Sequence, residues 1–123
     1  MYTFDTNAVI YHLNNEPGVQ VVVDEIIQSF APAYVSVITI TELFRFPKLS
    51  LQEESAIEDL LFAFSVIPLD AHMARKAADI GRTFNLKLAD SVIAATALFT
   101  GSTLLTRNVR DFRRVPSLLL KSI

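Results

Sequence analysis

Short apolar runs and longer apolar stripes alternate along the chain, and this alternation predicts strands separated by helices. Runs rich in β-branched or aromatic residues, each bounded by turn residues, predict strands. The predicted strands are Tyr2–Asp5, Tyr34–Ile40, Ser65–Leu69, Thr103–Thr106 and Val115–Leu120. Apolar residues spaced three or four positions apart predict amphipathic helices. The predicted helices are Ala8–Leu13, Val19–Phe30, a helix opened by a capping box of Thr39 and Glu42 and running to Phe46, Leu51–Phe64, a helix capped by Asp70, and Ala89–Thr100.

The order of these elements indicates an α/β fold. Strands alternate with helices and no hairpin signal joins two strands, so the sheet should be parallel with helices on both faces. A chain of 123 residues is long enough to bury roughly two thirds of the surface of its unfolded form. We find no linker and no internal repeat, and we therefore expect one domain over residues 1–123.

Composition narrows the class of protein. Apolar residues make up 51% of the chain and the mean hydropathy is +0.38, so we expect some apolar surface to be buried against another chain. The absence of cysteine excludes a disulfide framework, a thiolate nucleophile and a cysteine-based zinc site, and two isolated histidines make a poor metal cluster. No apolar stretch approaches the roughly 20 residues that cross a bilayer. We expect a cytoplasmic protein outside the membrane.

Charge is segregated along the chain. The net charge of −2 argues against a general nucleic-acid-binding surface. Residues 1–44 contain five acids and no lysine or arginine, whereas residues 107–123 contain five bases and one acid. A locally basic rim beside an acidic centre is therefore expected.

Four acids fall where an α/β sheet would bind a ligand. They lie at or just beyond the carboxyl end of a strand, or at a helix start: Asp5, Glu42, Asp90 and Asp111. In open α/β sheets ligands bind beyond the carboxyl ends of the strands. Each acid also has an ordinary structural explanation, as a helix cap, a capping-box partner, a first-turn residue or a loop residue.

Gathered at one edge, four carboxylates would repel each other and would need a partner charge, or they would protonate. A divalent cation is the simplest partner, and oxygen ligands without histidine or cysteine favour Mg²⁺ or Mn²⁺ over Zn²⁺. Such a metal can activate water and hold a phosphodiester for in-line attack. The pattern therefore predicts a metal-dependent nuclease.

Several segments resemble the PIN-domain ribonucleases, and most closely the VapC-type toxins of bacterial and archaeal toxin–antitoxin pairs. They are MYTFDTNAVI, SVITITEL, VIPLDAHMARKAADIG, LKLADSVIAATAL and LLTRNVRDF, and they cover nearly the whole chain in the family's order. The resemblance implies a PIN-like (Rossmann-like) three-layer sandwich with a five-stranded, mostly parallel sheet. It also implies an endoribonuclease with a Mg²⁺ or Mn²⁺ site, an RNA substrate with tRNA as one candidate, a homodimer, and inhibition by a cognate antitoxin.

Matched residue by residue, the resemblance assigns metal ligation and catalysis to Asp5, Glu42 and Asp90. The fourth ligand is an acid or Asn in the T-R-N-x-x-D-F segment, so Asn108 and Asp111 both fit, and we favour Asp111. Three small polar residues are expected to line the site, although caps and strand ends explain them equally well: Thr6, Asn7 and Thr106. Four arginines are candidates to hold RNA phosphates, with a solvated basic tail as the alternative: Arg107, Arg110, Arg113 and Arg114.

Three other functions fit parts of this pattern. A Mg²⁺-binding receiver domain is also doubly wound, but it would need paired acids beside its first strand and a lysine after a late strand. Here Asp5 is alone, and Lys121 is nearly the last residue of the sequence. A catalytically silent PIN-like interaction domain has nothing in its favour, because all four acid positions are filled. A housekeeping RNA-processing nuclease is the alternative to a toxin.

Overall fold

The strands form one parallel sheet with the first strand at its centre. The computed structural model describes residues 1–123, and its sheet has the order β3-β2-β1-β4-β5, in which every neighbouring pair is parallel. The strands are β1 (Tyr2–Phe4), β2 (Ala33–Ser36), β3 (Ser65–Ile67), β4 (Thr103–Thr106) and β5 (Leu120–Ser122). The predicted parallel α/β sheet is therefore confirmed.

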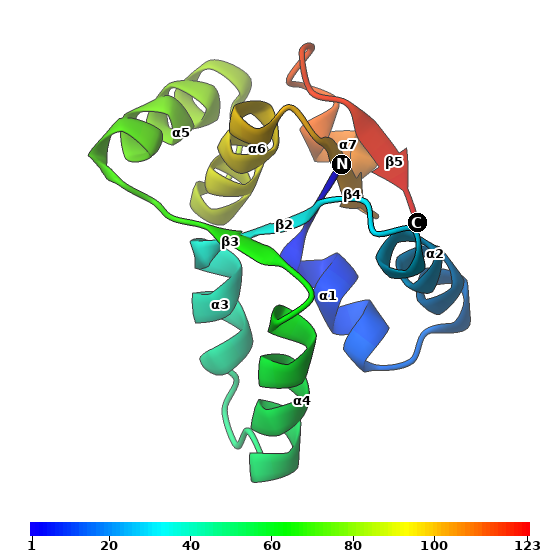
Figure 1. The fold of residues 1–123 in the computed structure, drawn as a ribbon. Coiled ribbons are helices and arrows are strands. Elements are labelled where there is room, and N and C mark those ends of the chain that lie inside the picture. Colours follow the sequence, from blue (N-terminus) through cyan, green and yellow to red (C-terminus); the bar gives the residue numbers. More distant parts are fainter.

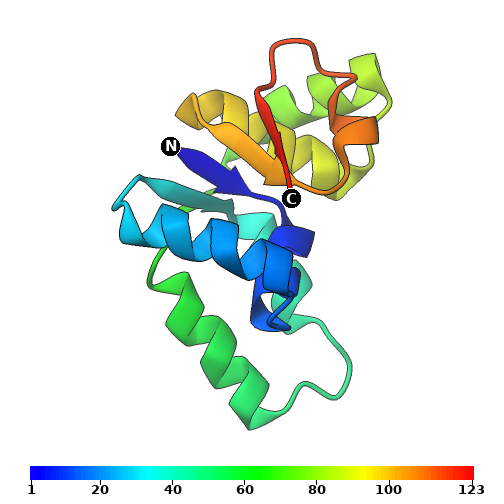
Figure 2. The ribbon, with the colours of Figure 1, turned by 90° about the vertical axis from the view of Figure 1, so that its right-hand side faces the viewer.

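Helices cover both faces of this sheet and complete a three-layer sandwich. They are α1 (Thr6–Leu13), α2 (Pro17–Gln28), α3 (Val37–Phe44), α4 (Leu51–Leu61), α5 (Ala71–Phe84), α6 (Leu88–Thr100) and α7 (Val109–Phe112). Figure 2 shows α1 and α2 on one side of the sheet and α5, α6 and α7 on the other, while Figure 1 shows α3 and α4 extending together away from it. None of these helices has the length and apolar character needed to span a membrane.

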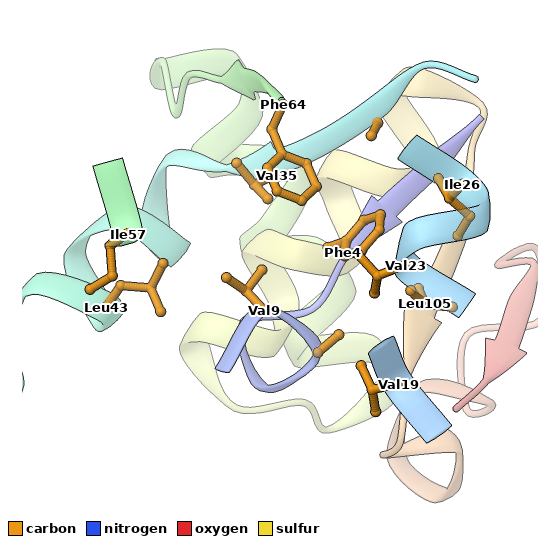
Figure 3. Close-up of a cluster of buried hydrophobic side chains, with 12 residues drawn as sticks. Phe4, Val9, Val19, Val23, Ile26, Val35, Leu43, Ile57, Phe64 and Leu105 are labelled. Carbon is orange, nitrogen blue, oxygen red and sulfur yellow. The ribbon is translucent and has the colours of Figure 1, made fainter. Parts of the chain in front are cut away.

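The hydrophobic core is divided by the sheet. The larger cluster packs under α1 and α2 and includes Phe4 and Phe64, whose rings meet edge to face with centroids 4.8 Å apart (Figure 3). A second cluster lies between β4, α6 and α7, and a third between α5 and α6. Neighbouring residues of β4 point to opposite faces, so Leu105 belongs to the first cluster and Leu104 to the second.

The segment from Val37 to Ile40 is helical, so the predicted strand Tyr34–Ile40 is wrong beyond Ser36. Ser36 is the N-cap of α3, and its hydroxyl accepts a hydrogen bond from the backbone N–H of Ile38 at 3.2 Å. The predicted capping box of Thr39 and Glu42 is therefore also wrong, because Thr39 lies inside the helix. Buried contacts outweigh the weak β preference of these branched side chains.

The predicted last strand, Val115–Leu120, is also wrong in its position. Leu120–Ser122 pairs with β4, whereas Val115 and Leu118 fill the core beneath α6 from a turn. Their apolar character reflects burial of an irregular segment, and Pro116 lacks the N–H that a ladder requires. Most other elements differ from the prediction only at their ends, and Thr103–Thr106 agrees in full.

Strand order places one crevice at the centre of the sheet. From β1 the chain continues to β2 and β3 on one side, then crosses back to β4 on the other. The order therefore reverses between β1 and β4, where such sheets bind ligands beyond the carboxyl ends of the strands. Asp5 follows β1 at this point, and Thr106 ends β4.

Candidate active site

Asp5 lies buried at the reversal point and is held by its neighbours. Its side chain is only 3% exposed. Oδ2 accepts a 2.6 Å hydrogen bond from the Thr106 hydroxyl, and Oδ1 accepts a 3.2 Å bond from the backbone N–H of Asn7, which makes Asp5 the N-cap of α1. Burial raises the pKa of Asp5, the two hydrogen bonds oppose that rise, and the charge of Glu42 adds to it.

Glu42 approaches the site from α3 and is oriented by a pair of threonines. The Thr6 hydroxyl donates a 2.7 Å hydrogen bond to Oε1 of Glu42 and lies 2.9 Å from the hydroxyl of Thr39. With Thr6 donating to the carboxylate, the Thr39 hydroxyl donates to Thr6. The structure thus brings Thr6 to the site, whereas the Asn7 side chain is exposed and only its backbone contacts Asp5.

Asp90 lies in the first turn of α6, and its pKa responds to the charges of the other three acids. Burial and then the charges of Asp5, Asp111 and Glu42 raise the pKa of Asp90 to about 6, while Lys87 lowers it. The other three predicted carboxylates therefore lie close enough to Asp90 to destabilise its charged form. Cationic charge entering the site would favour the charged form of Asp90.

Asp111 is held by two donors in the single-turn helix α7. Asn108 Nδ2 donates to its Oδ2 at 3.0 Å, and Arg114 Nη2 contacts its Oδ1 at 3.2 Å. The backbone N–H of Asn108 also donates to the Thr106 hydroxyl at 3.0 Å. Asn108 and Asp111 therefore contact each other directly, and Thr106 connects both to Asp5.

A divalent cation fits this site by its donor chemistry. No three acidic or histidine side chains are yet arranged to enclose an ion. The carboxylates nevertheless provide only oxygen donors. Burial, and to a smaller extent neighbouring acids, raise the pKa values of Asp5 and Asp90, and a cation would favour the charged forms of both. Oxygen-only donors suit Mg²⁺ and Mn²⁺.

Two hollows flank the carboxylates, and both carry basic side chains. One, of about 330 Å³, is lined by Thr6, Asn7 and Glu42 together with Arg45 and Phe46. The other, of about 390 Å³, adjoins Asp90 and Asp111 and carries Lys87 and Arg114. The sequence pattern predicts no site role for Arg45, Phe46 or Lys87. The available signal was the position of Lys87, three residues before Asp90 at the start of α6.

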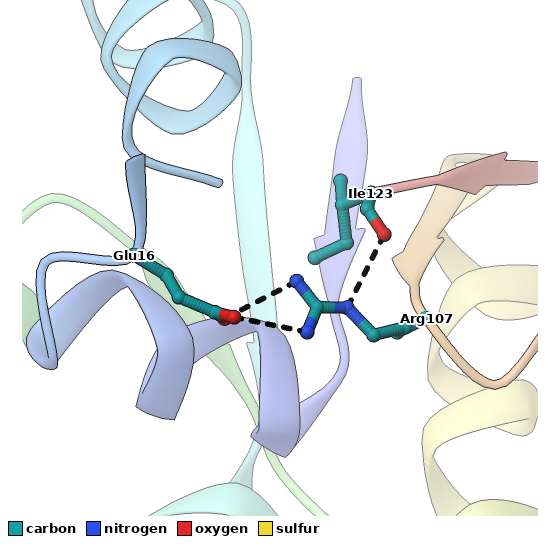
Figure 4. Close-up of polar contacts among 3 residues, drawn as sticks. All are labelled: Glu16, Arg107 and Ile123. Atoms are coloured by element: carbon teal, nitrogen blue, oxygen red, sulfur yellow. Dashed lines mark hydrogen bonds and ion pairs between the residues drawn. The ribbon is translucent and has the colours of Figure 1, made fainter. Parts of the chain in front are cut away.

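The four arginines of the C-terminal segment have different surroundings. Arg114 faces the site through Asp111, and Arg110 and Arg113 are exposed to solvent. Arg107 instead contacts Glu16 and the carbonyl oxygen of Ile123 (Figure 4).

Comparison with known proteins identifies the family of this chain. The family model described as PIN domain matches residues 2–118. Ribonuclease VapC19 of Mycobacterium tuberculosis is 31% identical over 126 residues, which cover 96% of this chain and 97% of that protein.

Solved structures share the fold over nearly the whole chain. VapBC2 from Rickettsia felis, bound to a DNA fragment from its promoter, superposes with a TM-score of 0.83 at 22% identity and covers 99% of this chain and 98% of its own. A toxin–antitoxin complex from Klebsiella pneumoniae gives a TM-score of 0.80 at 26% identity, covering 97% and 96%. The match of the family model over residues 2–118 and these similarities place the chain in the PIN-domain family, among its VapC-type ribonucleases.

Proposed function

We propose that this protein is a Mg²⁺- or Mn²⁺-dependent endoribonuclease and the toxin of a toxin–antitoxin pair. The observation that carries the proposal is the gathering of three acids around Asp90, whose pKa is raised to about 6 by burial and then by the charges of Asp5, Asp111 and Glu42. The name of VapC19 and the toxin–antitoxin complexes of similar fold support the same activity and partner.

Asp5, Glu42, Asp90 and Asp111 would hold the cation. When bound, the cation supplies positive charge that offsets the negative charge developing on an attacked phosphate and lowers the pKa of water. The Thr106 hydroxyl and the Asn7 N–H keep Asp5 oriented and favour its charged form. The Thr6 hydroxyl donates to Glu42 and orients it. We favour Asp111 over Asn108 as the fourth ligand, because the Asn108 side chain donates to it.

The two flanking hollows fit an RNA strand that crosses the carboxylates. Arg45 on one side, and Lys87 and Arg114 on the other, would bind phosphates on either side of the cleaved bond. A small basic contribution on a net-acidic chain favours substrates selected by shape and unpaired nucleotides, such as the loops of tRNA.

Several large apolar side chains are exposed and could be covered by a binding partner. Phe30, Leu51, Phe62 and Leu88 are each at least 80% exposed, and each could contribute apolar surface to a protein–protein contact. We assign such surface to a homodimer and to a cognate antitoxin, and we place the protein in the cytoplasm with its RNA substrate.

A growth assay tests the toxin assignment. Induced expression of the wild-type chain should arrest growth, and co-expression of the antitoxin encoded beside it should restore growth. Asp5→Asn, which removes one charge at nearly constant volume, should be harmless at equal protein level. The matched control Asp79→Asn removes an exposed carboxylate of α5 and should arrest growth like wild type. Arrest by Asp5→Asn would contradict the assignment.

A further inference from the structure

Arg107 connects three segments of the chain at the edge of the site. Its Nη1 and Nη2 donate to the two carboxylate oxygens of Glu16, each at 3.1 Å, and its Nε donates to the carbonyl oxygen of Ile123 at 3.3 Å (Figure 4). Its guanidinium carbon lies 4.1 Å from the centre of the Tyr11 ring. The protein itself therefore uses the three donating nitrogens and one face of this side chain.

These contacts conflict with a role in holding RNA. A carboxylate bound by both amino groups occupies the planar fork that a phosphate would take. Glu16 also places a negative charge where the phosphate oxygens would lie. Arg107 thus differs from Arg114 and Lys87, which line a hollow beside the acids.

The position of Arg107 in the chain links these contacts to the candidate ligands. Thr106, just before it, donates its hydroxyl to Asp5 at 2.6 Å. Asn108, just after it, donates its backbone N–H to that hydroxyl and its side chain to Asp111, each at 3.0 Å. Movement of Arg107 would therefore shift the groups that orient two of the four carboxylates.

We propose that Arg107 is a positioning residue that, held by Glu16 and Tyr11, fixes the segment from Thr106 to Asn108 and so orients Asp5 and Asp111 for catalysis. This inference rests on the proposed nuclease function. The ion pair is partly exposed, with 44% and 42% of the two side chains accessible, so it contributes little to global stability. Its effect lies in geometry, since small displacements of catalytic groups have large kinetic costs.

Steady-state kinetics on an RNA oligonucleotide that the wild type cleaves separate positioning from phosphate binding. Arg107→Gln, Glu16→Gln and the double variant should each lower kcat by roughly tenfold or more, with KM little changed. The double variant should be no worse than either single variant, because the two side chains act as a unit. Arg107→Lys keeps the charge but loses the fork and should be as slow as Arg107→Gln. Arg82→Gln, which breaks an exposed pair on α5, is the control and should match wild type.

The opposite pattern would overturn the proposal. If Arg107 held a phosphate, Arg107→Gln would raise KM, Arg107→Lys would retain most activity, and Glu16→Gln would leave kcat unchanged. The Glu16 variant is decisive, since loss of an acid beside a phosphate-binding arginine cannot weaken RNA binding by charge.

Hydrogen exchange of the Asn108 amide provides a readout that needs no nuclease activity. In metal-free protein this amide should exchange faster in Arg107→Gln and Glu16→Gln than in wild type or Arg82→Gln, because the Thr106 acceptor is no longer fixed. Unchanged exchange would overturn the positioning role. A wild-type protein that cuts no RNA would refute the nuclease function instead, and the exchange experiment would still test the contact.

Discussion

The Thr106 hydroxyl donates a 2.6 Å hydrogen bond to Oδ2 of Asp5, and this bond joins the ends of β1 and β4 across 101 positions of sequence. It adds a side-chain link at the ends of two strands that are also paired through their backbones, at the point where the sheet order reverses. Because Asp5 is buried, the bond favours a charged form that burial opposes. The position of the candidate nuclease site therefore depends on a small polar residue as well as on acids.

Thr106→Val removes that hydroxyl while keeping the branched shape. We expect RNA cleavage to fall roughly 10- to 100-fold, as for other groups that orient metal ligands, and the free energy of unfolding to fall by about 1–3 kcal/mol because a buried acceptor loses its donor. Cleavage rates and urea melts measure the two effects. Thr106→Ser keeps the hydroxyl and should retain most activity. Equal activity of the Val and Ser variants would rule out the orienting role.

The charge on Asp90 should make the metal-free protein less stable as pH rises. The pKa of Asp90 is about 6 in the folded chain against an ordinary value of 3.8, so between these values the folded state binds more protons than the unfolded state. Stability contributed by this group is therefore lost from about pH 4 to pH 6. Melting curves in EDTA should show Asp90→Asn gaining Tm over wild type as pH increases through this window. A constant difference would be inconsistent with the shift.

A bound divalent cation should restore the stability that the metal-free protein loses as pH rises. At pH 7, above the pKa of about 6 for Asp90, burial and the neighbouring acids oppose the charge on Asp90, and a bound cation stabilises only the folded site. Millimolar Mg²⁺ or Mn²⁺ should therefore raise the Tm of wild type more than that of Asp90→Asn. Sodium chloride at equal ionic strength is the control for general screening. Equal responses of the two proteins would argue that the cation acts elsewhere.

Asn108 and Asp111 can be distinguished by substitution, since their side chains bond each other at 3.0 Å. If Asp111 is the fourth ligand, Asp111→Asn should reduce cleavage and raise the Mn²⁺ concentration needed for half activity. Asn108→Ala should reduce cleavage less and leave that Mn²⁺ requirement near the wild-type value. The reverse ranking would assign the ligand to Asn108.

Close packing of α5 on α6 fixes the helix that carries Asp90. A Cβ atom at Gly81 would lie 2.5 Å from the Oγ of Ser91, so Gly81→Ala should destabilise the fold by about 1–3 kcal/mol. Ser91→Ala should recover much of this loss in the double variant. The control Gly18→Ala meets no atom within 4 Å and should be neutral or slightly stabilising. Denaturant melts of wild type, Gly81→Ala, Ser91→Ala and the double variant measure the coupling between the two positions.

Local sequence patterns predicted the parts of the fold that depend on local causes. Thr103–Thr106 is a short apolar run between turn residues, and Gly101 ends α6 with the expected left-handed conformation at φ 63°. The start at Leu88 placed Asp90 in the first turn, as predicted. The strand prediction for the start of α3 was wrong because the β-branched residues there suit a strand locally. Buried contacts such as that between Thr39 and Thr6 require a helix instead.

Long-range partners explain what sequence could not reveal about the site. Arg107 lies in a basic segment that suggests phosphate binding, but its carboxylate partner Glu16 is 91 positions away. No periodicity or motif connects the two residues. The same holds for Thr106 and Asp5, whose proximity follows from strand order rather than from spacing.

The most direct test of the central claim is cleavage of total cellular RNA and of a tRNA pool by purified protein with Mg²⁺, with Mn²⁺ and with EDTA. The account predicts discrete products from wild type that require a divalent cation, disappear in EDTA, and are absent for Asp90→Asn and Asp5→Asn. The ends of those products would identify the substrate. Folded wild-type protein, free of a co-purified inhibitor, that cuts no RNA under any of these conditions would contradict the account, as would cleavage that persists in EDTA or in the Asp90→Asn variant.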